Sequence, residues 1–226
     1  MHVTEADDLD RPADSDIDVI EVDFVATDES LAGWIRLDAR RALGATRFLV
    51  ALLVAREDPV VLIDYDLPLA RTAYEFRSSG VWTEFVCETP LDHWTIGLEA
   101  FALRIDPSGT VTPDTFGDRV PIGLDLDLDT VGAPEGDASS FSIELDVHGE
   151  VLIADRAWDL TARGTRTRAS TGVRHPLHLV APAAPTIAGD FSIGWPDELG
   201  QMVLERRGWV GGNRPGWVTL PVQSVE

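Results

Sequence analysis

The sequence contains no lysine, a single cysteine and no long hydrophobic run. Because Cys87 has no cysteine partner, the chain excludes a disulfide framework and any multi-cysteine metal site. The longest apolar run, FLVALLVA at 48–55, is far shorter than the roughly 20 residues that a membrane helix needs. No basic segment precedes an apolar core near the N-terminus, as a signal peptide would require. We therefore expect a cytoplasmic protein without membrane insertion.

Arginine supplies all 18 basic residues, against 39 acidic residues, and the formal net charge is −21. A field this negative repels phosphate backbones and anionic lipid head groups. We therefore expect neither nucleic acid nor a membrane surface as a partner. Two origins of the acidity stay open: a GC-rich codon bias, and adaptation to high salt, in which acidic surfaces keep a protein dissolved.

Several enzyme motifs are also missing from the chain. There is no Gly-x-Ser-x-Gly turn to present a nucleophilic serine, and no Gly-x-Gly-x-x-Gly between a strand and a helix. His175 and His178 lie three apart, which puts them on opposite faces of an extended strand and disfavours a shared metal ion. We expect no metal and no cofactor.

The first 16 residues, MHVTEADDLDRPADSD, are acidic and poor in large apolar side chains. Such a composition buries too little apolar surface to offset the entropy that ordering costs. We therefore predict a disordered acidic tail at 1–16 and a folded part that begins at residue 17.

From residue 17 onward, short segments of alternating polarity are separated by proline and glycine turns, which predicts β-strands. The clearest alternation lies at 119–132. One face there carries Ile122, Leu124, Leu126 and Leu128, and the other Gly123, Asp125, Asp127 and Asp129. The continuous apolar run at 48–55 predicts a strand buried on both faces. The fold class is therefore all-β, an antiparallel barrel or an open β-sandwich.

The three aspartates of this stretch, Asp125, Asp127 and Asp129, have the spacing with which a calcium loop begins. A calcium loop also needs turn residues and a closing glutamate, whereas here a leucine stripe fills the intervening positions. We therefore interpret the three aspartates as the solvent-exposed face of a strand.

The stretch TPLDHWTIGLEAFAL at 89–103 contains the best candidates for a site. On a strand, His93 and Glu99 share one face, and if that face lines a cavity both reach it. Trp82 and Trp94 would then supply apolar wall, and a carboxylate with an imidazole is able to move protons. We predict His93, Glu99, Trp82 and Trp94 as ligand-binding residues, with His93 and Glu99 as weak catalytic candidates. The alternative is that His93 is an ordinary half-buried residue and Glu99 faces solvent.

Three runs of the chain carry a family resemblance: VWTEFVCETPLDHWTIGLEAFAL (81–103), GDRVPIGLDLDLDTVG (117–132) and DVHGEVLIADRAWDLTARGTRTR (146–168). Together they resemble the lipocalin-like carotenoid 1,2-hydratase (hydroxyneurosporene synthase) superfamily, and most closely its actinobacterial members of unknown activity. The resemblance implies a lipocalin-like β domain with an apolar cavity at 17–172. It also implies that 173–226 is a short β remnant of a second domain, packed on the first.

The members of this family include hydratases that add water to a terminal alkene, and related proteins act as pericyclases on polyenes. Members typically carry Gly-x-Arg-Asp-His-Ser-Trp-Gly after a strand pair. This chain has GTRTRASTG at 164–172, so Thr167 and Arg168 stand where the acid and the histidine belong. A hydroxyl is too weak an acid and a guanidinium stays protonated, so neither replaces that proton donor. Arg166 is retained, and we expect it to form a structural salt bridge.

Three functional hypotheses follow. The first is binding of an apolar or isoprenoid-like small molecule in a β cavity, with the proton-donor motif lost. The second is a cyclase, isomerase or hydratase of secondary metabolism that acts on a polyene mainly by shape. The third is a structural role, in which open sheet edges pair in a homodimer.

Overall fold

A computed structural model of the chain describes residues 2–9, 15–70, 74–106, 109–111, 114–170, 190–196, 202–209 and 216–221. These residues are almost all in strands, so the predicted all-β class is confirmed. The elements are α1 (Glu5–Leu9), β1 (Ile17–Ala26), β2 (Leu31–Arg40), η1 (Arg41–Leu43), β3 (Ala45–Val54), β4 (Val60–Pro68), β5 (Tyr74–Ser78), β6 (Val81–Thr89), β7 (His93–Arg104), β8 (Gly109–Val111), β9 (Asp118–Thr130), β10 (Glu135–Asp137), β11 (Ser140–Ile153), β12 (Arg156–Ala169), β13 (Asp190–Pro196), β14 (Met202–Trp209) and β15 (Gly216–Pro221). No helix of the described residues has the length and apolar character needed to span a membrane.

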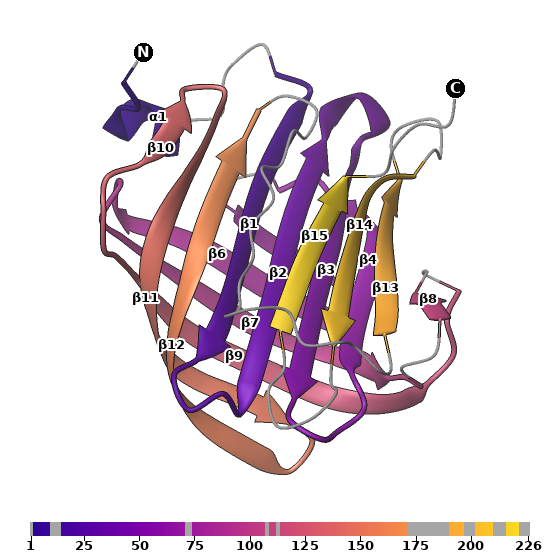
Figure 1. Ribbon diagram of the computed structural model, residues 1–226. Helices are drawn as coiled ribbons and strands as arrows, with labels where there is room; N and C mark the ends of the chain where they lie inside the picture. Colours follow the sequence, from indigo (N-terminus) through magenta and orange to yellow (C-terminus); the bar gives the residue numbers. More distant parts are fainter. Residues whose placement is uncertain are drawn as a thin grey trace.

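The larger sheet curls into a partial ring. Its strand order is β10-β11-β12-β1-β2-β3-β4-β7-β6-β5, and β9 joins β7 to β11. The junction between β4 and β7 is short, with Val60 opposite Arg104 and Val61 opposite Leu103. Because β6 takes most of that edge of β7, the hairpin β5–β6 branches away from the ring. Figure 1 shows β7 and β9 crossing behind β1 and β2 at a steep angle, so two layers enclose the core.

Period-two alternation decides which side chains enter this core. On β7 the buried set is Trp94, Ile96, Leu98, Ala100 and Ala102. On β9 the leucine stripe predicted from the sequence is buried and its aspartates are exposed, so that prediction is confirmed. Both strands therefore present one apolar face to the inside and one polar face to solvent.

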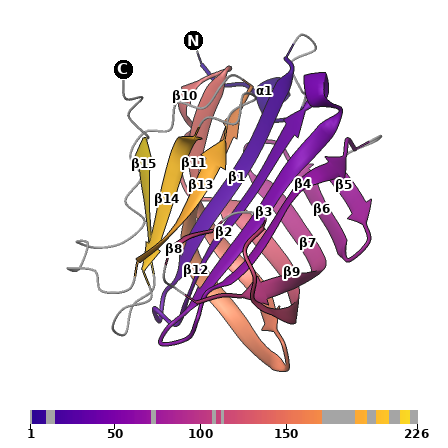
Figure 2. The ribbon, with the colours of Figure 1, turned by 90° about the vertical axis from the view of Figure 1, so that its right-hand side faces the viewer.

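Strands β2 and β3 are both buried on both faces, and for β3 this is what the run at 48–55 predicted. Their inner side chains join the main core, whereas Trp34 and Leu49 point outward into a second apolar cluster. That cluster includes Ile193 of β13, which belongs to a smaller sheet in the order β15-β14-β13-β8. Figure 2 shows β13, β14 and β15 as a layer beside β1, β2 and β3.

The segment predicted as a second-domain remnant, 173–226, supplies the last three strands of this smaller sheet. Its fourth strand, β8, comes from within 17–172 and pairs in parallel with β13. The smaller sheet thus combines strands from both predicted parts of the chain. His175 and His178 lie outside the described residues.

The N-terminal segment differs from the disordered tail predicted for 1–16. Glu5–Leu9 form α1, and Asp8 within it is fully buried. The prediction rested on the small amount of apolar surface that this segment can bury, and burying a carboxylate adds a further cost. Here the cost is offset by an ion pair between Asp8 and Arg166.

Candidate functional site

The structure places the four predicted binding residues on two opposite faces of the sheet. Trp94 belongs to the inner face of β7 and is 1% exposed. His93 and Glu99 belong to the outer face of β7, and Trp82 to the outer face of β6. The face that carries His93 and Glu99 therefore lies outside the ring rather than lining its interior.

His93 belongs to a polar cluster at the start of β7. It stands directly opposite Asp129 on β9, and its Nδ1 lies 2.9 Å from the Asp129 carboxylate. Its Nε2 lies 3.5 Å from the carboxylate of Asp127. Both aspartates are more than half exposed, so these contacts contribute little to stability.

His93 and Glu99 are not brought together. They are six residues apart on one strand, which at about 3.3 Å per residue separates them by about 20 Å. No single reacting atom lies within hydrogen-bond distance of both side chains. The pair named as weak catalytic candidates is thus two separate features of the same face.

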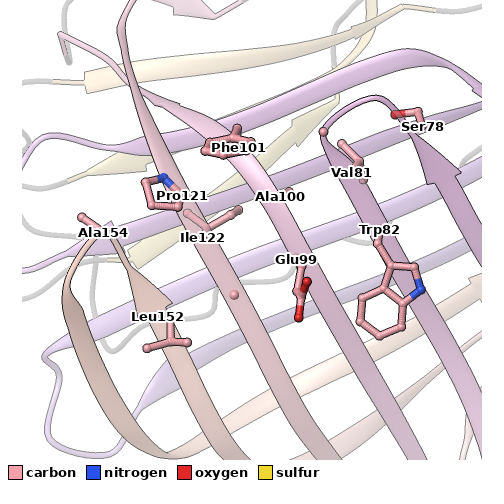
Figure 3. A pocket seen from close by; sticks show the side chains of 12 residues that line it. Ser78, Val81, Trp82, Glu99, Ala100, Phe101, Pro121, Ile122, Leu152 and Ala154 are labelled. Carbon is pink, nitrogen blue, oxygen red and sulfur yellow. The ribbon is translucent and has the colours of Figure 1, made fainter.

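Trp82 and Glu99 do share a feature, because they line one open groove on the outer face. The groove has a volume of about 520 Å³ and crosses β6, β7, β9 and the end of β11. Figure 3 shows Trp82 and Glu99 on neighbouring strands, with Leu152 across from them. The remaining lining is Ser78, Gly80, Val81, Ala100, Phe101, Pro121, Ile122, Gly123 and Ala154.

Two glycines shape the floor of this face. A Cβ at Gly97 would lie 3.1 Å from the ring of Trp82, and one at Gly123 would lie 3.3 Å from Leu152. Trp82 and Leu152 therefore lean over neighbouring strands instead of standing upright. The indole N–H of Trp82 also donates to Glu75 at 3.3 Å, which orients the ring.

One end of the groove carries exposed apolar surface. Phe101 is 47% exposed and Leu152 is 40% exposed, although both are large hydrophobic side chains. The guanidinium carbon of Arg119 lies 4.0 Å from the centre of the Phe101 ring, so a cation covers part of it. Clustered exposed apolar residues of this kind mark binding surfaces more often than isolated ones do.

The other end of the groove is acidic. A second hollow of about 310 Å³ continues along the same face and shares Trp82, Glu99, Gly123 and Leu152 with the first. It adds the carboxylates of Glu84, Asp125 and Glu150 to that of Glu99. The whole groove therefore grades from an apolar end near Phe101 to an acidic end near Asp125.

On the inner face, Trp94 takes part in a buried polar cluster. Its indole N–H donates to the carboxylate of Asp8 at 3.0 Å, and Arg166 of β12 forms an ion pair with the same carboxylate at 2.5 Å. The guanidinium carbon of Arg166 also lies 4.7 Å from the Trp94 ring centre. Arg166 thus forms the structural salt bridge that the sequence predicted.

The pKa of the Asp8 carboxyl reflects a competition. Burial raises this pKa, but hydrogen bonds from Arg166, its positive charge, the Leu91 amide and the Trp94 indole together outweigh burial. The net result is an Asp8 pKa below its usual value. Asp8 therefore stays ionised in the folded protein at neutral pH.

Sequence reasoning missed Asp8, although a signal for its helix was present. Thr4 and Asp7 have the spacing of a capping box, and Asp7 accepts hydrogen bonds from the backbone N–H and the hydroxyl of Thr4, both at 2.7 Å. The acidic residues that follow Thr4 favour a helix N-terminus. The partner of Asp8 is not visible in the sequence, because Arg166 lies 158 positions away.

No protein-family model matches this chain, and no curated protein or solved structure is significantly similar to it. Among the described residues, no group of three or more histidine, cysteine, aspartate or glutamate side chains is arranged to hold a metal ion. The functional argument therefore rests on the geometry of the groove and of the inner cluster.

Acid should release α1 from the ring. Because the folded pKa of Asp8 is depressed, its contribution to stability is complete above its ordinary value near 3.8 and is lost as pH falls through the lower folded value. We expect the stability gap between wild type and Asp8→Asn to be constant near neutral pH and to narrow progressively below about pH 4. Urea unfolding of both proteins from pH 3 to pH 7 measures it. A gap that stays constant down to pH 3 would contradict a docked Asp8 carboxylate.

Proposed function

We propose that this protein binds an apolar small molecule with a cationic or hydrogen-bond-donating end in the groove on the outer face of β6, β7, β9 and β11. The observation that carries this proposal is the gradient along the groove, from exposed Phe101 at one end, past Leu152 and Glu99, which line both hollows, to the carboxylate of Asp125 at the other end. An isoprenoid-like molecule suits the apolar end. Membership of the lipocalin-like hydratase family is part of the same proposal, and it predicts an apolar ligand as well.

The apolar end has the dimensions of a ligand site. Its volume of about 520 Å³ falls in the range of roughly 300–1,000 Å³ that small-molecule pockets occupy. Its lining is mainly aromatic and aliphatic, with the Ser78 hydroxyl and the Glu99 carboxylate as polar groups. A few polar groups in an apolar wall fix the orientation of a ligand.

The acidic end sets the preferred charge of the ligand. Glu84, Glu99, Asp125 and Glu150 line the second hollow, and the chain as a whole carries a net charge of −21. Such a potential attracts cations and repels anions. A ligand that spans both hollows would place its apolar part against Phe101 and its positive or donor end beside Glu99.

Catalysis on a polyene is the alternative function, and the groove favours it less. Among the residues described as lining the apolar end, Glu99 is the one acidic group, and His93 lines neither hollow. General acid–base chemistry needs a proton donor and acceptor within reach of the same substrate. The groove therefore supports binding more strongly than chemistry.

Three naphthalene probes of matched size test the predicted charge preference. Isothermal titration calorimetry would compare naphthylmethylamine, naphthylmethanol and naphthoate on the full chain. We expect the affinity to fall in that order, because the three probes share the naphthalene ring and their polar groups are cationic, neutral and anionic, respectively. Equal affinities, or tightest binding of naphthoate, would contradict the proposed acidic end.

Single substitutions test whether naphthylmethylamine binds in the groove. Trp82→Ala should weaken binding of naphthylmethylamine about tenfold, since one aromatic contact is worth about 1.4 kcal/mol. Glu99→Gln should reduce the ratio of the affinity for naphthylmethylamine to the affinity for naphthylmethanol by about threefold. Trp158→Ala is the matched control, because Trp158 packs against the core on the other face of the sheet, and it should change affinity less than twofold. If Trp158→Ala and Trp82→Ala weaken binding equally, the groove is not the site.

A further inference from the structure

Four N–H groups converge on the carboxylate of Asp8 at the inner face. Arg166 donates from Nη1 to Oδ1 at 2.5 Å and from Nη2 to Oδ2 at 3.0 Å. The Trp94 indole at 3.0 Å and the Leu91 backbone amide at 2.7 Å donate to Oδ2 as well. A forked guanidinium with further N–H donors is the geometry with which proteins recognise carboxylates.

The donors and the acceptor come from different parts of the molecule. Arg166 on β12 and Trp94 on β7 belong to the ring, and Leu91 lies in the turn between β6 and β7. Leu91 has a φ of 60°, a left-handed conformation that is costly for a residue other than glycine. In this conformation its amide donates to Asp8, whereas Asp8 itself is carried by the separate helix α1.

The helix α1 has few other anchors. It is five residues long, and isolated helices of that length are unstable in water. Its last residue, Leu9, is 47% exposed. Val3, just before the helix, is partly buried against the core, and Arg168 donates to the backbone carbonyl of Asp8. The docking of α1 therefore depends largely on Asp8.

The arginines that the ring contributes to this cluster need a negatively charged partner. Arg168 lies 3.6 Å from the Asp18 carboxylate and donates to the Tyr74 hydroxyl at 2.6 Å. Arg166 is 1% exposed, and within the described part of the chain its ion pair is with Asp8. Its Nε has no hydrogen-bond partner among the described residues. Without Asp8, a buried guanidinium would stand unpaired, which is strongly unfavourable.

We propose that Arg166, Trp94 and the Leu91 amide form a carboxylate-binding site, which α1 fills with Asp8 and which a free carboxylate enters when that side chain is absent or displaced. The ligand class is a carboxylate group, either free or at the end of a larger molecule. The site lies on the inner face, so it is independent of the groove on the outer face. The short helix α1 acts as a built-in ligand that an external carboxylate competes with.

Rescue of Asp8→Ala by formate tests this site. The substitution removes one carboxylate from the full chain, and formate is that carboxylate as a free ion. We expect 0.2 M sodium formate to raise the Tm of Asp8→Ala by about 3–5 °C above its value in 0.2 M sodium chloride, as binding at a tenfold excess over Kd would do. The effect should saturate with formate concentration, and wild type should show no formate-specific rise.

Cys87 provides a second readout of occupancy. The pKa of the Cys87 thiol is raised to about 11, mainly by burial and also by the negative charge of Asp8, while the positive charges of Arg166 and Arg168 lower it. Removing Asp8 takes away a negative charge that raises the thiol pKa and leaves the two arginines, which lower it. The thiol should therefore ionise more readily and react severalfold faster with iodoacetamide at pH 8. Formate should slow that reaction again, and chloride should not.

The double variant Asp8→Ala/Arg166→Met is the matched control, because it lacks the guanidinium that would hold formate. It should show no formate-specific rise in Tm. If formate and chloride act alike on Asp8→Ala, or if the double variant responds as strongly, the proposal is overturned. Should Asp8→Ala not fold in chloride, the recovered fraction of folded protein in formate against chloride decides the same question.

Discussion

Trp94→Ala should lower the free energy of unfolding by about 3–5 kcal/mol, the usual loss when a buried aromatic side chain is truncated. Trp94 is 1% exposed, and its indole also donates to Asp8 and lies against Arg166. Its removal therefore creates a cavity and leaves a buried carboxylate short of a donor. Urea denaturation at neutral pH measures the change.

Trp82→Ala is the comparison for this prediction. Trp82 lies on the outer face, only partly buried, and we expect its loss to cost about 1 kcal/mol. The two tryptophans thus separate stability from binding: Trp94 holds the core and Trp82 lines the groove. If Trp94→Ala were as stable as Trp82→Ala, the assignment of faces on β6 and β7 would be incorrect.

Gly149→Ala should destabilise the protein by about 3 kcal/mol or more, because two costs add. The φ of Gly149 is 133°, which side chains other than glycine rarely adopt. A Cβ there would also lie 1.9 Å from the backbone oxygen of Asp125 on the neighbouring strand β9. The close approach of β9 and β11 at this point aligns Glu150 and Leu152 along the groove. Thermal unfolding followed by circular dichroism gives the loss.

Gly132→Ala is the control for this glycine. A Cβ at Gly132 would meet no atom within 4 Å, so the substitution should change stability by less than about 0.5 kcal/mol. A tolerated Gly149→Ala would show that β9 and β11 do not approach as closely as the structure has them.

The features that follow from local periodicity were predictable from the sequence. The leucine stripe on β9 and the doubly buried run on β3 both appear as expected, because alternation and continuous apolar runs report burial directly. The all-β class followed from many such segments separated by turns. These predictions needed no knowledge of which strands pair.

The orientation of β7 was also contained in its pattern. Trp94, Ile96 and Leu98 form the apolar set of that strand, and the apolar set faces the core. The hypothesis that His93 and Glu99 face a cavity placed the polar set inside instead. Trp82 and Trp94 lie on opposite faces of the sheet, so the two indoles do not form one wall.

The burial of Asp8 could not be predicted from the composition of the N-terminal segment. A buried carboxylate is explained only by its partners, and Arg166, Trp94 and Leu91 are all distant in the sequence. The groove was likewise not predictable, because it depends on which strands lie beside β7. The strand pairing that brings Trp82 opposite Glu99 and Glu99 opposite Gly123 is a property of the fold as a whole.

Photoaffinity labelling tests the central claim, which is that the outer face of β6, β7 and β9 binds the ligand. A diazirine derivative of naphthylmethylamine would be irradiated with the full chain, and the labelled residues read by mass spectrometry. We expect labels at 78–82, 99–101 and 121–123, competed by unlabelled naphthylmethylamine. Competed labelling confined to inner-face residues such as Leu126 and Leu145 would contradict this account and favour a ligand inside the ring.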